Sequence, residues 1–190
     1  RTLRRECPAC EVSVREDLTE HLVEALLDHD IDCALLSTPI NEPRLTLERL
    51  GVEQLVVVVP SAGPLGEQTV LGVAELREQP AVLLEEIHCL GQQVQSFCSA
   101  KRVAPRVVCR TTQLGTILEL VGLGLGVSIV PAMAAAVDKS PLRRYLRFKS
   151  SRPTREIAIA WHASRTRGVV ALRLAELVRE HVARAAQSKP

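Results

Sequence analysis

The chain has 190 residues, which suits one or two small domains with a sizeable buried core. Its 46% hydrophobic and 24% charged residues are typical of a globular protein and exclude a disordered chain. No apolar run approaches the roughly 20 residues that span a bilayer, and no apolar stretch follows residues 1–6 as in a signal peptide. We therefore expect a cytoplasmic protein without a membrane partner.

Charge is distributed unevenly, although the net charge is only +2. Residues 1–137 carry 11 Lys/Arg and 18 Asp/Glu, whereas residues 138–190 carry 13 and 4. Such asymmetry can indicate contact with nucleic acid, but a basic part can also dock on an acidic part of the same chain. We favour docking, and the 2% of aromatic residues offer no stacking platform for single strands.

Residues 87–98 hold the most informative pattern, a cysteine pair nine positions apart with a histidine before the first cysteine. Gly91 and the glutamines after it predict a loop that opens into a helix, with Cys89 near the helix N-terminus. There the unpaired N–H groups and the helix dipole favour the reactive thiolate. In an unbroken helix the Cα atoms of Cys89 and Cys98 lie roughly 13 Å apart, whereas a disulfide needs about 7 Å or less. The pair either never bonds or unwinds the helix when it bonds.

A second cysteine pair, Cys7 and Cys10, precedes residues 11–15, whose alternation predicts a strand. A thioredoxin-like dithiol lies between a strand and a helix instead, and a zinc site needs two further ligands at fixed spacing. Neither role is favoured, and no metal or cofactor is expected. Cys33 is expected to be a small buried side chain.

The first half of the chain predicts alternating strands and helices. Asp17 and Glu20 resemble a capping box, the helix after them has an apolar stripe, and a short strand follows at 32–37. This order predicts a parallel, right-handed β-α-β unit. Residues 45–50 and 53–60 are interpreted as a pair of strands, and the run Val56–Val59 is expected to be buried on both faces.

The second half continues the alternation. A strand at 81–84 places Cys89 outside its carboxyl end, where βα units bind their ligands. Gly122–Gly126 is interpreted as a C-capping turn because a helix precedes it, which excludes a dinucleotide-binding fingerprint. The sequence predicts an α/β fold of two lobes, with lobe I formed by residues 1–52 and 158–190 and lobe II by residues 53–157. Further strands and helices are expected at 106–110, 113–123, 127–130, 142–148, 155–161 and 169–186.

Two segments resemble the effector domain of LysR-type transcriptional regulators, namely 32–36 and the Gly-x-Gly…Pro segment 124–131. The spacing His-Cys-Leu…Phe-Cys at 88–98 is similar to the hydrogen-peroxide sensors of that family, the OxyR group. The resemblance covers essentially the whole chain. It implies a two-lobed, periplasmic-binding-protein-like (type 2) regulatory domain whose first strand and DNA-binding helix-turn-helix precede this chain.

The resemblance also implies the roles of individual residues. Cys89 corresponds to the peroxidatic thiol that becomes a sulfenic acid, and Cys98 to the resolving thiol. His88, Thr19 and Arg155 match further positions around the peroxide pocket. The implied protein is a homodimeric or tetrameric activator, not an enzyme, with hydrogen peroxide as effector. It would contact DNA through the missing domain, and RNA polymerase is a candidate partner.

One departure and one alternative stand beside this interpretation. Where these sensors usually have Arg-Asp, this chain has Gly91-Gln92, and a glutamine cannot accept a proton at neutral pH. The alternative is a regulator of the same fold that binds a metabolite in a cleft between the lobes, lined by Thr19, Thr112 and Arg155. A peroxidase that turns over would need a site for a recycling reductase, and the sequence shows none.

Overall fold

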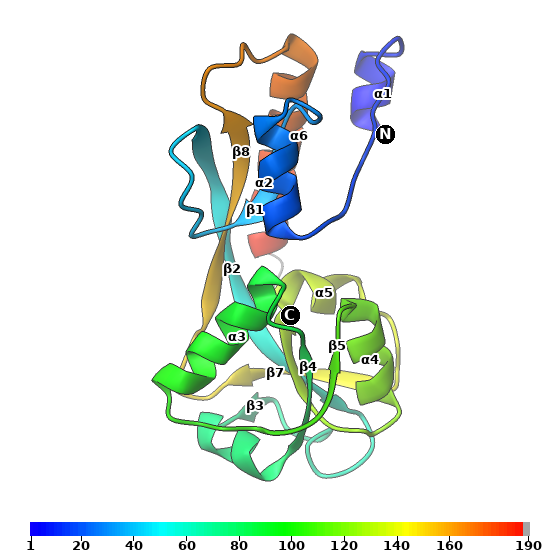
Figure 1. Cartoon of the computed structure of the whole chain (residues 1–190). Helices are drawn as coiled ribbons and strands as arrows, with labels where there is room; N and C mark the ends of the chain where they lie inside the picture. The colour runs from blue at the N-terminus through cyan, green and yellow to red at the C-terminus, as the bar shows by residue number, and fades with distance from the viewer. Residues whose placement is uncertain (188–190) are drawn as a thin grey trace. The chain divides into compact units, whose positions relative to one another are not determined.

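The chain forms two compact units, and the computed structural model describes residues 1–187, with side chains to residue 184 (Figure 1). Unit 1 consists of residues 1–52 and the described residues from 156 onward, and unit 2 of residues 53–155. Strands β2 (Leu45–Pro60) and β8 (Thr154–His162) each belong partly to both units. The expected α/β class is confirmed; the last three residues of the predicted lobe I lie outside the described residues.

In unit 1, helices pack against β1 (Ala34–Ser37) and the parts of β2 and β8 that belong to this unit. Its helices are α1 (Thr2–Glu6), α2 (Thr19–Leu27) and α6 (Val169–Gln187). Strand β1 (Ala34–Ser37) pairs antiparallel with β8, and Leu26 of α2 is fully buried in the core beside it. Helix α1 lies against α6, to which it is tied by an ion pair between Glu6 and Arg173 with an N–O distance of 2.8 Å.

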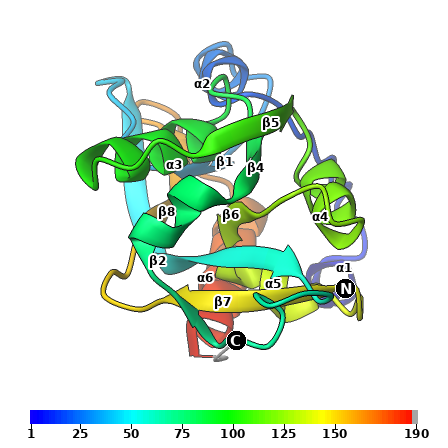
Figure 2. The same cartoon turned by 90° about the horizontal axis from the view of Figure 1, so that it is seen from below.

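Unit 2 contains the remaining elements. In its sheet, β2 pairs antiparallel with β6 and β7, and β7 runs beside β2 in Figure 2. A second pair, β4 and β5, is parallel. In chain order the elements are β3 (Val70–Leu71), the 3-10 helix η1 (Val73–Glu78), β4 (Pro80–Leu84), α3 (Cys89–Ala100), β5 (Arg106–Thr111), α4 (Leu114–Gly122), β6 (Ser128–Pro131), α5 (Ala132–Val137) and β7 (Arg143–Phe148).

The four consecutive valines of β2, at positions 56–59, are buried on both faces, as their sequence predicts. Because side chains alternate along a strand, Val57 and Val59 join one core cluster, and Val56 and Val58 join another. The first cluster includes the buried face of α3, and the second includes that of α4. The two helices therefore cover opposite faces of β2, which fixes α3 on the core of unit 2.

Three predictions for strands in the first half of the chain are wrong. The expected parallel β-α-β unit is absent from the described residues, because β1 pairs antiparallel with β8. Residues 11–15 form no strand either, and the side chain of Val14 is 88% exposed. Alternation predicts a strand only if another strand pairs with its N–H and C=O groups, and no described residue does so here. The two strands expected at 45–50 and 53–60 are one continuous strand.

The capping box predicted at Asp17 does not form. Helix α2 has Leu18 as its N-cap and no side-chain cap. Asp17 instead accepts hydrogen bonds from His21 and Arg15 at 2.7 and 2.6 Å. The hydrogen bond from His21 lowers the pKa of the Asp17 carboxyl most, followed by that from Arg15. Asp17 also accepts the N–H of Leu18, the N-cap residue, at 2.8 Å, so its carboxylate binds residues beside the helix start and does not cap α2.

The glycine-rich segment after α4 is a C-capping turn, as predicted. Gly124 has a φ of +83°, the left-handed conformation that glycine adopts most readily. The N–H of Leu125 donates to Leu120 and that of Gly124 to Val121, which is the Schellman pattern that ends a helix. Strand β6 follows, so this segment ends α4 and connects it to β6.

Candidate redox site at the start of helix α3

Cys89 is the first residue of α3, directly after a short turn that follows β4. The N–H of Glu85 donates to Thr111 on β5 at 2.9 Å, and the N–H of His88 donates back to Glu85 at 3.1 Å. These two bonds fix the point at which α3 begins. The structure thus places Cys89 at a helix N-terminus beyond the carboxyl end of a strand, as the sequence predicts, where the helix dipole favours a negative charge.

Gly91 allows the first turn of α3 to lie directly on the turn before it. A Cβ atom at this position would be 2.2 Å from the carbonyl oxygen of Glu85 and 3.0 Å from that of Leu84. Both contacts are with backbone, so neither can move away easily. A glycine is therefore required here by the close approach of the backbone, which gives a physical reason for the departure seen at this position in the sequence.

Cys89 and Cys98 lie on the same unbroken helix, since α3 extends over residues 89–100. Nine residues of helix separate their Cα atoms by roughly 13 Å, about twice the distance that a disulfide allows. Both are free thiols. Cys89 is partly exposed, whereas Cys98 is 5% exposed among the apolar side chains of the unit 2 core. The burial raises the pKa of the Cys98 thiol, so it stays protonated while α3 is folded.

His88 lies immediately before Cys89 and carries a buried polar atom without a partner. Its Nε2 accepts or donates no hydrogen bond to the described residues. Leaving a buried polar group unpaired costs about 1–3 kcal/mol. A water molecule or a small polar ligand that reached Nε2 would satisfy this atom.

Arg155 is held by an acidic residue that the sequence did not single out. Its Nε donates to Glu53 at 2.7 Å, and the other oxygen of this carboxylate accepts the N–H of Met133 in the first turn of α5 at 2.7 Å. Glu53 is 6% exposed. The one available signal was its place two residues before the apolar run of β2. The structure thus brings Arg155 to Glu53 and α5.

Arg155 also borders a groove of about 440 Å³ within unit 2. Its walls come from α4 and α5 and are mainly apolar, with Leu114, Leu118, Met133 and Val137 among them. Thr111, which precedes α4, accepts a hydrogen bond from the N–H of Gln113. Helix α4 itself has Gln113 as its N-cap and no side-chain cap.

Thr19, the remaining predicted site residue, is the first residue of α2 in unit 1. Cys89, His88 and Arg155 belong to unit 2. The assignment of Thr19 to a common pocket with them stays a prediction.

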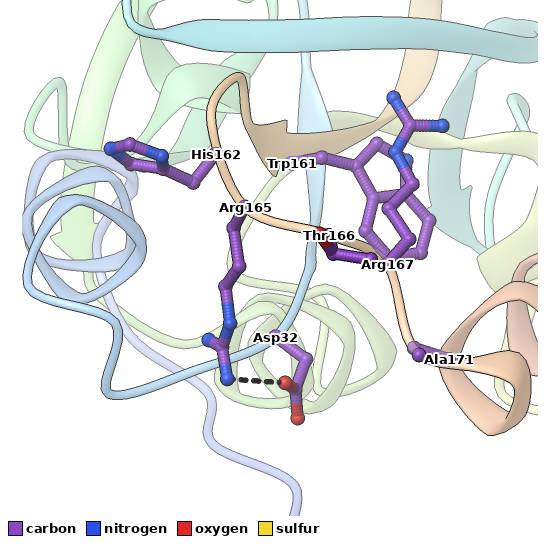
Figure 3. Close-up of a pocket in the computed structure, with 8 residues that line it drawn as sticks. Asp32, Trp161, His162, Arg165, Thr166, Arg167 and Ala171 are labelled. Carbon is purple, nitrogen blue, oxygen red and sulfur yellow. Dashed lines mark ion pairs between the residues drawn. The ribbon is translucent and has the colours of Figure 1, made fainter.

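Unit 1 contains a further small pocket, which the sequence did not predict (Figure 3). Arg165 pairs with Asp32 at 2.9 Å and also donates to the carbonyl oxygens of His29 and Ile31. The guanidinium of Arg167 lies 4.8 Å from the centre of the Trp161 ring. These contacts clamp the loop between β8 and α6, and we assign them a structural role.

The described residues provide neither a cluster of metal ligands nor a membrane-spanning helix. No group of three or more His, Cys, Asp or Glu side chains is placed to hold a metal ion. No described helix is long and apolar enough to cross a bilayer.

Comparison with known proteins gives consistent matches. The model of the LysR substrate binding domain matches residues 1–183. A probable hydrogen peroxide-inducible genes activator from Streptomyces viridosporus is 33% identical over 177 residues, which make up 91% of this chain and 56% of that protein. The chain thus spans little more than half the length of the curated relatives that it matches.

Two solved structures are similar in both fold and sequence. An OxyR cysteine-to-serine mutant from Corynebacterium glutamicum with bound hydrogen peroxide has a TM-score of 0.82 and 29% identity, covering 97% of this chain and 61% of that one. The reduced OxyR regulatory domain from Pseudomonas aeruginosa has a TM-score of 0.81 and 28% identity, covering 94% of this chain and 87% of that one.

Proposed function

The chain belongs to the LysR substrate-binding domain family, and we propose that it is the regulatory domain of a transcriptional activator that senses hydrogen peroxide through Cys89 and Cys98. The observation that carries this proposal is the start of α3, where a partly exposed cysteine follows a histidine with a buried, unpaired Nε2. The names of the similar proteins, peroxide-inducible activators and a peroxide-bound OxyR, support the same effector here.

The first chemical step is oxidation of Cys89. Its thiolate attacks one oxygen of hydrogen peroxide, the O–O bond breaks, and Cys89 becomes a sulfenic acid while hydroxide leaves and takes up a proton to become water. An N–H at His88 Nε2 would stabilise the charge on the leaving oxygen. Thr19 and Arg155 are proposed as further members of the peroxide pocket. The Nε of Arg155 donates to Glu53. In this proposal the Nη atoms of Arg155 contact the peroxide.

The second step joins the two sulfurs. The Cys98 thiol loses its proton and attacks the sulfur of the Cys89 sulfenic acid, which forms the disulfide and releases water. Folded α3 prevents this step in two ways, because it keeps the Cα atoms of the two cysteines roughly 13 Å apart and keeps Cys98 buried and protonated. Formation of the bond therefore requires α3 to unwind.

Unwinding of α3 is the proposed signal. Leu90, Val94 and Cys98 all contribute to the unit 2 core, so a disulfide would remove part of that core and change the surface of the unit. Refolding of one segment after a covalent change is a common form of switch. In the whole protein we propose a homodimer or tetramer that binds DNA through a helix-turn-helix domain, contacts RNA polymerase and works in the cytoplasm.

Gly91 and Gln92 bear on the rates of Cys89 oxidation and of disulfide formation. Gln92 is exposed and can donate or accept a hydrogen bond but cannot take a proton at neutral pH. We expect oxidation or disulfide capture to be slower than in sensors that carry Arg-Asp at these positions.

Mass spectrometry of the reduced chain after one equivalent of hydrogen peroxide tests the mechanism. Trypsin releases residues 78–101 as one peptide, whose only cysteines are Cys89 and Cys98. We expect this peptide to become lighter by two hydrogens and to resist alkylation. The Cys98→Ser variant should instead carry a sulfenic acid at Cys89 that dimedone traps. The mechanism is wrong if both thiols of the parent chain remain open to alkylation.

A second candidate function is the binding of a small metabolite, which the groove beside Arg155 favours. An anionic ligand would compete with Glu53 for the guanidinium. This function predicts that a ligand raises the melting temperature equally in the parent chain and in Cys89→Ser. Loss of all stabilisation in Arg155→Met, with Arg152→Met as control, would locate the ligand at Arg155.

A further inference from the structure

The Cys7-Pro8-Ala9-Cys10 segment forms a tight turn directly after α1. The N–H of Cys10 donates to the carbonyl oxygen of Cys7 at 3.1 Å, which closes a four-residue turn. Pro8 is its second residue, where the fixed φ of proline suits such turns. The ends of a turn of this kind lie within about 7 Å of each other, the range in which a disulfide forms. In contrast to Cys89 and Cys98, this pair needs no unfolding to bond.

The turn is attached to a folded part of unit 1 and is open to solution. Leu3 of α1 is 7% exposed, and Glu6, which directly precedes Cys7, pairs with Arg173 of α6. Both cysteines are partly exposed free thiols. No described cluster of three metal ligands includes them, so a closed metal site does not account for the pair.

We propose that Cys7 and Cys10 form a second redox couple, which exchanges between dithiol and disulfide with low-molecular-weight disulfides. The thiolate of one cysteine attacks a sulfur of the small disulfide, breaks its S–S bond and releases one small thiolate. The other cysteine then loses its proton and attacks the mixed disulfide, which releases the second small thiol. The protein dithiol is oxidised, and one small disulfide is reduced to two thiols. This proposal does not depend on peroxide sensing by Cys89.

The test uses the reduced 190-residue chain in buffers with increasing ratios of oxidised to reduced glutathione, followed by alkylation in acid and digestion. Trypsin releases residues 6–15 as one peptide that contains Cys7 and Cys10 and no other cysteine. We expect this peptide to lose two hydrogens and to lose both alkyl groups as the ratio rises. Pro8→Gly should loosen the turn, so that roughly two- to fivefold higher ratios are needed for half-oxidation.

Two variants separate this couple from the peroxide switch. In Cys7→Ser the two-hydrogen loss should disappear, and a glutathione adduct on Cys10 should replace it. In Cys89→Ser/Cys98→Ser the peptide 6–15 should behave as in the parent chain, whatever the outcome for peptide 78–101. Alkylation of both Cys7 and Cys10 at every ratio, or glutathione adducts in place of the internal bond in the parent chain, would overturn the proposal.

Discussion

At the scale of single residues, His88 distinguishes the Cys89 site from an ordinary helix start. A buried Nε2 without a partner is a cost to the fold, and such a cost is often kept where it serves a ligand. In the proposed mechanism, an N–H at this position donates to the oxygen that leaves when peroxide is cleaved. The same atom has no comparable use if Cys89 is inert.

The first prediction concerns His88→Asn, which removes the Nε2 group. We expect oxidation of Cys89 by hydrogen peroxide to slow about a hundredfold, the usual contribution of one positioned proton donor or hydrogen-bond donor. The rate is measured by stopped flow or by timed alkylation of peptide 78–101. His181→Asn, on the exposed face of α6, is the matched control and should react as the parent does. Equal rates for both variants would remove His88 from the site.

At the scale of elements, α3 begins where it does because Gly91 packs on the backbone of the preceding turn. We expect Gly91→Ala to lower the free energy of unfolding by about 1–3 kcal/mol, since the added Cβ would overlap the Glu85 carbonyl. Urea denaturation of the reduced chain measures the change. Gly115→Ala in α4 is the matched control, because a Cβ there meets nothing within 4 Å. This substitution should raise the free energy of unfolding by at most about 1 kcal/mol. A neutral Gly91→Ala would contradict the described contact.

A buried ionic cluster joins α4, the end of α5 and β7. Arg143 is 7% exposed, binds Asp138 through two hydrogen bonds of 2.8 and 2.9 Å, and donates to the carbonyl of Leu118. We expect Arg143→Met to cost about 3–5 kcal/mol, because it leaves the Asp138 carboxylate buried without its cation. The neighbouring Arg144 is exposed, so Arg144→Met should change stability by less than about 0.5 kcal/mol. Equal effects would mean that the cluster is not buried in solution.

The same cluster predicts a pH dependence. The hydrogen bonds from Arg143 lower the pKa of the Asp138 carboxyl well below its usual range. A carboxyl with a lowered folded-state pKa stabilises the fold above its unfolded pKa of about 3.9, and this stability is lost as the pH falls toward the folded-state pKa. The stability difference between the parent chain and Asp138→Asn should therefore be constant from about pH 7 to 5 and shrink below about pH 4. A difference that declines already between pH 7 and 5 would contradict this assignment.

At the scale of the whole molecule, features set by neighbouring residues could be predicted from the sequence. The valine run of β2, the glycine that ends α4 and the helix start at Cys89 all depend on a few adjacent side chains. Pairings between distant segments could not be predicted in the same way. The antiparallel register of β1 on β8 joins residues more than a hundred positions apart, as does the contact of Glu53 with Arg155. For this reason the alternation of residues 11–15 predicts a strand that does not form.

The same distinction applies to the candidate site. The sequence shows that His88 precedes Cys89 and that Cys98 follows nine residues later. Because one helix contains both cysteines, their separation could be predicted from helix geometry alone. The burial of Cys98 and the unpaired Nε2 of His88 depend on how α3 packs against the unit 2 core. The proposed switch rests on these features together, since oxidation at one end of α3 must release a buried thiol at the other.

Amide hydrogen exchange across α3, before and after one equivalent of hydrogen peroxide, tests the central claim most directly. The reduced chain should protect the helical amides from Gln93 to Ala100, and oxidation should remove that protection in the same molecules whose peptide 78–101 has lost two hydrogens. In Cys98→Ser, peroxide should leave the protection in place. A Cys89–Cys98 disulfide that forms while these amides stay protected, or peroxide treatment that changes neither mass nor protection, would contradict the account.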